Sequence, residues 1–151
     1  MRFARTVLFT VPLLLMQVAP GAGAETKTFV GSAACKDCHE AEYGRFRQYS
    51  KKAVSWEHVS RMMPKLTVEE QISCYECHTT GYGKGGFVSY EKTPHLADVG
   101  CETCHGPGGE HAQTGDPATI GKPTMATCET CHDATRVKSF GFKPLIHSGA
   151  H

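Results

Sequence analysis

The stretch Cys101-Glu-Thr-Cys104-His105 sets the pattern for the whole chain, because the same arrangement occurs four times. Each copy has two cysteines three positions apart and a histidine directly after the second cysteine. The other copies are Cys35-Lys-Asp-Cys38-His39, Cys74-Tyr-Glu-Cys77-His78 and Cys128-Glu-Thr-Cys131-His132. The chain has 151 residues and 8 cysteines, and none of the cysteines lies outside these four motifs. Because every cysteine belongs to a motif, the sequence favours four copies of one binding site over a set of disulfides.

The spacing is the attachment signature of c-type haem. Two cysteines three positions apart on a helical turn face the same way and can add to the two vinyl groups of one porphyrin edge, while the next histidine ligates the iron. Zinc is the alternative, since paired Cys-x-x-Cys motifs also bind zinc, but zinc does not explain the histidine after every second cysteine. The motifs therefore predict four covalently attached haem c groups. Their proximal ligands are expected to be His39, His78, His105 and His132.

The beginning of the chain predicts export. Two arginines within the first five residues precede an apolar run and a small-residue stretch that ends at Ala24, as in a secretory signal peptide. The apolar run is about 13 residues long, whereas roughly 20 are needed to span a bilayer. We expect residues 1–24 to be cleaved and residues 25–151 to form one tetrahaem domain, periplasmic or secreted, with no transmembrane segment.

The composition of the expected mature chain constrains its core and its partners. It has 14 basic against 15 acidic residues, which gives no reason to expect nucleic acid as a partner. About 32 residues per haem are too few for a side-chain core around each haem, so we expect the haems themselves to form the core. Haem propionates add negative charge to the protein, so we expect partners that are cationic at the contact surface. The expected partners are redox proteins of anaerobic respiration, namely cytochromes and quinol-linked or outer-membrane complexes.

Periodicity and capping patterns predict helices around the motifs. An apolar, largely aromatic stripe at steps of three and four predicts one helix over about residues 39–61, packed against porphyrin faces. The stripe consists of Tyr43, Phe46, Tyr49, Ala53, Trp56 and Val59 or Ser60. A capping box at Thr67 opens a helix that leads into the second motif. Thr93-Pro94 predicts a short helix before the third motif, and Thr124 is expected to cap the helix of the fourth. The glycine-rich segment 81–90 predicts a small flap or hairpin.

Five histidines remain for the four distal positions on the irons. They are His58, His95, His111, His147 and His151, of which all but His95 are expected to be ligands. One of His147 and His151 is expected to ligate the fourth haem, and the other the second haem or a neighbouring molecule. Methionine ligation by Met62, Met63 or Met125 is the alternative, although methionines beside an aromatic stripe more often pack.

Three stretches of the chain resemble the cytochrome c-554 family of tetrahaem cytochromes c. They are Phe29–Ser32, Cys74–Gly86 and Val99–Gly108 with His111 just beyond. The resemblance implies a mostly α fold with long loops, haems in stacked pairs and an electron carrier of the periplasm. It also implies that His111 is the sixth ligand of the first haem. A histidine on the helix after the first motif would serve the third haem, but residues 50–54 contain none, and His58 is the nearest replacement.

Two classes of function remain open at this point. If all irons are six-coordinate, the protein relays single electrons, with the chemistry supplied by the cofactor. If one iron is five-coordinate, the protein is a haem enzyme acting on a nitrogen oxide, hydroxylamine or peroxide, and the resemblance points to the haem of His78. Self-association into a haem filament is a third alternative. No independent catalytic site stands out, so electron transfer is the preferred interpretation.

Overall fold

The computed structural model describes residues 27–135, and these residues are helical with no strand. The α-helices are α1 (Glu40–Tyr49), α2 (Ser55–Ser60), α3 (Val68–His78), α4 (Cys101–His105), α5 (Gly109–Thr114) and α6 (Met125–Glu129). Five short 3-10 turns in the described residues lie before or between them, namely η1 (Ser32–Cys35), η2 (Lys51–Val54), η3 (Met63–Lys65), η4 (Pro94–Leu96) and η5 (Pro117–Thr119). The predicted mostly α class is confirmed. The expected signal peptide and the tail histidines His147 and His151 lie outside the described residues.

The expected single helix over residues 39–61 is wrong, because the chain bends at Ser50. Ser50 is extended, with φ −90° and ψ 121°, and separates α1 from η2 and α2. The Arg47 side chain stabilises the bend by donating a hydrogen bond to the carbonyl of Ala53 at 2.6 Å. Phe46 and Ala53 stay buried, but Tyr49 is 65% exposed. The apolar stripe therefore belongs to two helices, and one of its aromatic residues faces solvent.

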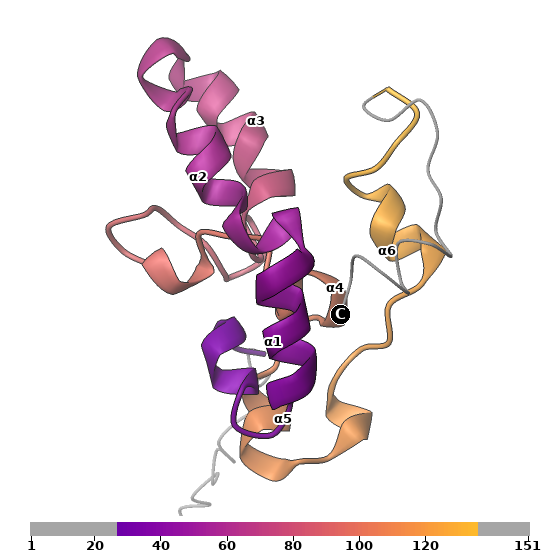
Figure 1. The fold of residues 1–151 in the computed structure, drawn as a ribbon. Helices are drawn as coiled ribbons and strands as arrows, with labels where there is room; N and C mark the ends of the chain where they lie inside the picture. The colour runs from indigo at the N-terminus through magenta and orange to yellow at the C-terminus, as the bar shows by residue number, and fades with distance from the viewer. Residues whose placement is uncertain (1–26, 136–151) are drawn as a thin grey trace, which may run out of the picture.

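Helices α2 and α3 lie side by side (Figure 1). The predicted capping box opens α3, since Thr67 Oγ1 accepts the Glu70 N–H at 3.3 Å and the Glu70 carboxylate accepts the Thr67 N–H at 2.8 Å. The hydroxyl of Ser55 on α2 donates to the His78 carbonyl at 2.8 Å and accepts the Val99 N–H at 2.9 Å. One buried hydroxyl thus ties α2 to the end of α3 and to the segment that enters α4.

A small side-chain core lies between the α2–α3 pair and the segment after α3. Phe87, Leu96 and Ala97 form its buried centre, and Phe29, Trp56, Tyr75 and Tyr82 pack around them. The rings of Trp56 and Phe87 have centroids 5.5 Å apart, and those of Tyr75 and Phe87 meet edge to face at 5.3 Å. Tertiary packing here is made by aromatic side chains that come from several segments.

The glycine-rich loop after α3 closes on itself without forming a strand. Gly86 N–H donates to the Gly81 carbonyl at 3.0 Å, and Phe87 N–H donates to the Thr80 carbonyl at 2.8 Å. This is a flap, as the sequence predicts, and it inserts Phe87 into the core. The helix expected after Thr93-Pro94 is a single 3-10 turn, η4, and α4 begins separately at Cys101. Within residues 27–135, no helix is both long and apolar enough to cross a membrane.

Candidate haem-attachment sites

Each of the four motifs is folded as one helical turn. The second motif ends α3 and the third fills α4. The first runs from the last residue of η1 to the residue before α1, and the His39 N–H donates to the Cys35 carbonyl at 2.9 Å. The fourth begins in the last two residues of α6 and continues into the turn after it, where the His132 N–H likewise donates to the Cys128 carbonyl at 2.9 Å. Residues at positions i, i+3 and i+4 share one side of such a turn, so both thiols and the imidazole of each motif fit one haem c.

All eight cysteines lie in the described part of the chain, and none of them forms a disulfide there. Among those same residues, no three His, Cys, Asp or Glu side chains converge on a point that could hold a metal ion. Each motif presents a pair of thiols followed by an imidazole.

Two histidines are oriented by hydrogen bonds to backbone carbonyls. Nδ1 of His105 lies 3.0 Å from the carbonyl oxygen of Gly121, and Nδ1 of His111 lies 2.9 Å from that of Asp116. A carbonyl only accepts, so each Nδ1 carries the proton. Histidines that bind metals in proteins are held in the same way, with the other ring nitrogen left for the metal. The tautomer of both imidazoles therefore fits iron ligation through Nε2.

The rings of His39 and His111 lie close together although the two residues are far apart in the sequence. Their ring centroids are 6.2 Å apart, with 26° between the ring planes. Two imidazoles bound end-on to one metal, with bonds of about 2 Å, place their ring centres about 6 Å apart. The position of His111 on α5 thus fits an axial pair with the proximal histidine of the first motif.

The other candidate distal ligands are less well placed. His58 is exposed on α2, and Met62 and Met125 are exposed as well. The ring of His95 lies against Gly31, where an added Cβ would meet its Cδ2 at 3.1 Å. His95 is exposed, but it contacts the entry to the first motif, which its spacing in the sequence does not reveal.

The first and third motifs are direct neighbours. Ser32 Oγ accepts the Cys101 N–H at 3.0 Å. The thiols of Cys35 and Cys101 share a hydrogen bond, which raises the pKa of Cys35 and lowers the pKa of Cys101 to about 6. The sequence pattern alone does not indicate this contact of Ser32, although Ser32 lies in the first of the stretches that carry the resemblance.

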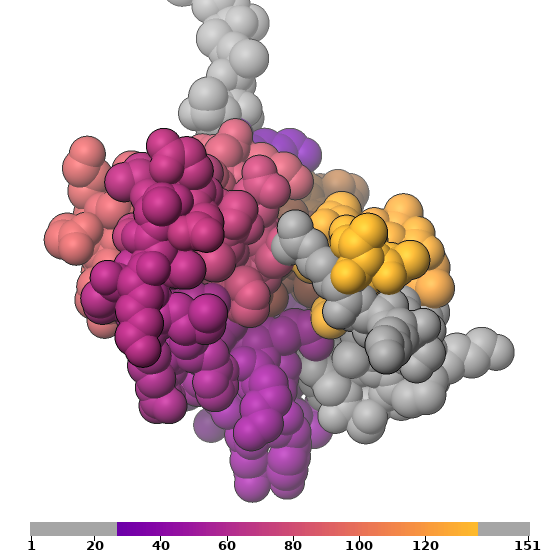
Figure 2. All heavy atoms as spheres, turned by 90° about the horizontal axis from the view of Figure 1, so that it is seen from above, coloured from indigo at the N-terminus to yellow at the C-terminus, as the bar shows by residue number. Residues whose placement is uncertain are grey.

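The fourth motif lies close to both the third and the second. Burial raises the pKa of Cys104, and the neighbouring thiols of Cys128 and Cys131 raise it further. Cys131 Sγ lies 4.0 Å from the carbonyl oxygen of Glu76 in α3. Figure 2 shows the last described residues, in yellow, on the side of the molecule next to the segment that contains α3. The attachment sites are therefore adjacent in the order first, third, fourth, second.

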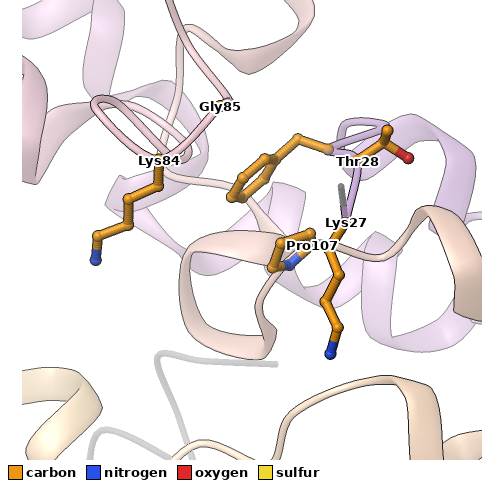
Figure 3. Close-up of a pocket in the computed structure, with 6 residues that line it drawn as sticks. Lys27, Thr28, Lys84, Gly85 and Pro107 are labelled. Atoms are coloured by element: carbon orange, nitrogen blue, oxygen red, sulfur yellow. The ribbon is translucent and has the colours of Figure 1, made fainter. Parts of the chain in front are cut away.

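A surface hollow of about 600 Å³ lies beside the third motif (Figure 3). Its lining residues are Lys27, Thr28, Phe29, Lys84, Gly85 and Pro107. The side chains of Lys27 and Lys84 extend in the same direction from its two sides. Their charges make this part of the surface positive, so it would attract an anionic group.

The chain is similar to known cytochromes in the region of the Cys-x-x-Cys-His motifs. The family described as cytochrome c554 and c-prime matches residues 34–106, which contain the first three motifs. The chain is 31% identical to cytochrome c-554 of Nitrosomonas europaea over 102 residues, 58% of this chain and 43% of that protein. It is 36% identical over 69 residues to the C-type polyheme cytochrome OmcB of Geobacter sulfurreducens, 42% of this chain and 9% of that protein.

The chain thus spans less than half the length of the curated relatives it matches. No solved structure matches it. The shared motifs, folded as helical turns, and the match over residues 34–106 make the chain similar to the cytochrome c554 family of c-type cytochromes.

Proposed function

We propose that the mature chain is a periplasmic electron carrier that relays single electrons through four covalently attached haems. The haems would supply the one-electron chemistry, and the protein would determine where they are held. The observation that supports this function best is the unbroken series of neighbouring attachment sites, from the first through the third and fourth to the second. Partners are other redox proteins that dock at an exposed haem edge.

The chain's own residues would hold each haem from both sides of the iron. Eight cysteines supply the thioethers, namely Cys35, Cys38, Cys74, Cys77, Cys101, Cys104, Cys128 and Cys131. The motif histidines are the proximal ligands, and His58, His111, His147 and His151 are the proposed distal ligands. Ligation by two histidines favours low-potential haems, since methionine in one axial position raises the potential.

The number of haems is tested by mass spectrometry of the denatured protein. We expect the polypeptide from Glu25 onward plus four haems, because each motif is complete and folded as one turn. The haems should remain attached during acid extraction, since the thioethers are covalent. A mass with three haems or fewer, or haem released by acid, would contradict the proposal.

The relay itself is tested by the spin state of the irons. If every iron has two axial ligands, the oxidised protein should show only low-spin bands and the reduced protein should not bind carbon monoxide. Electronic absorption and electron paramagnetic resonance spectra of the holoprotein measure both properties. High-spin ferric signals in the unmodified protein would instead indicate an iron open to small molecules, as an enzyme requires.

A further inference from the structure

Glu102 is a buried carboxylate at the junction of two haem-attachment sites. It lies between Cys101 and Cys104 in the third motif, and its side chain is among the most deeply buried, at 2% exposed. Its Oε1 accepts the N–H of Gly108 at 2.7 Å, and its Oε2 accepts the N–H of Gly31 at 2.7 Å. The N–H of Val30 is shared between the two oxygens, at 3.0 and 3.2 Å.

The backbone groups that Glu102 holds belong to segments that build the first haem site. Val30 and Gly31 lead directly into η1, which carries Cys35. Gly108 precedes α5, which carries His111. Glu102, which is part of the third motif, therefore contacts both the entry to the first motif and the segment that leads to the proposed distal ligand. Its charge also contributes to the raised pKa of Cys35.

The fourth motif provides an internal comparison, because its sequence Cys-Glu-Thr-Cys-His is identical to that of the third. Glu129 occupies the position of Glu102, yet it is exposed at the end of α6. Part of the difference comes from the residues that follow, and part from the contacts with Val30 and Gly31. The third motif continues into Gly106-Pro-Gly-Gly109, whose backbone turns back onto the carboxylate, whereas the fourth continues into Asp133-Ala-Thr135.

We propose that Glu102 is a fixed negative charge that lowers the reduction potentials of the first and third haems while it positions both attachment sites. This inference rests on the proposed function. An oxidised iron carries one more positive charge than a reduced iron, so a nearby carboxylate stabilises the oxidised form. A buried charge acts more strongly than an exposed one, because water and salt screen it less. Hydrogen bonds from three backbone N–H groups hold the carboxylate in place.

The experiment compares two matched variants of the four-haem protein, Glu102→Gln and Glu129→Gln. Each removes one negative charge from the same position of an identical motif. Potentiometric titration followed by the haem absorption bands should show an upward shift for two of the four haems in Glu102→Gln. In Glu129→Gln the titration curve should remain close to that of the unmodified protein, because the exposed charge is screened.

Three results would overturn the proposal while leaving the electron relay intact. One is an unchanged titration curve for Glu102→Gln with four low-spin haems attached. Another is an equal shift in both variants, since burial would then have no effect. The third result concerns Glu102→Asp, the variant to be used if Glu102→Gln loses haem, because aspartate keeps the charge on a shorter side chain. Glu102→Asp should be less stable but keep the original potentials. Raised potentials in this variant would overturn the proposal. Failure of the unmodified chain to carry four haems would instead contradict the proposed function.

Discussion

Replacing His111 by alanine is expected to convert one haem from low spin to high spin without releasing it. The imidazole of His111 lies 6.2 Å from that of His39, measured between ring centroids, and its Nδ1 bonds the Asp116 carbonyl. Loss of this ring would leave the first iron with a single axial ligand. The absorption spectrum of the oxidised variant should gain high-spin bands, and the reduced variant should bind one carbon monoxide.

The control for this experiment is His95→Ala, which removes a histidine that is not among the proposed ligands. All haems of that variant should remain low-spin, although its contact with Gly31 is lost. Mass spectrometry should show the same number of haems in both variants. An unchanged spectrum for His111→Ala would remove this residue from the set of ligands.

Replacing Gly86 by alanine is expected to lower the free energy of unfolding by about 1–3 kcal/mol, the usual effect of overpacking. A Cβ at this position would lie 2.5 Å from the Thr80 carbonyl oxygen and 2.8 Å from the Cα of Gly81. Both atoms are backbone and belong to the loop that inserts Phe87 into the core. They cannot rotate away as a flexible side chain would. Denaturant unfolding followed by circular dichroism measures the loss.

Gly44→Ala provides the opposite case in the same chain. Gly44 lies inside α1, and a Cβ there would meet no heavy atom within 4 Å beyond its chain neighbours and the backbone of its own helix. Alanine has the higher helix propensity, so this variant should be more stable by about 0.5–1 kcal/mol. Equal destabilisation of both variants would show that the close approach at Gly86 is not the cause.

The haem motifs and the helix that opens at Thr67 could be predicted from the sequence because both depend on local spacing. A thiol pair and the next histidine share a helical turn wherever the chain is helical, and a capping box involves residues only three positions apart. Both features are present in the structure as short-range hydrogen bonds.

The bend at Ser50 and the burial of Glu102 could not be predicted in the same way. The apolar stripe keeps its spacing across Ser50, so periodicity alone indicates one continuous helix. Glu102 and Glu129 occupy identical pentapeptides, and only contacts with Val30, Gly31 and Gly108 distinguish them. These contacts are long-range or depend on the path of the following loop, which local patterns do not encode.

The contacts between the first and third motifs also constrain how the protein matures. Glu102 lies 72 positions after Val30, and Cys101 lies 69 positions after Ser32. Contacts between residues so far apart in the sequence form late in folding, because closing such a long loop costs conformational entropy before the contacts stabilise it. If the chain is exported and loaded with haem as proposed, its first motif emerges well before the segments that hold it. Haem would then be attached to a motif that is still accessible, and the first site would acquire its final shape only when the third motif docks.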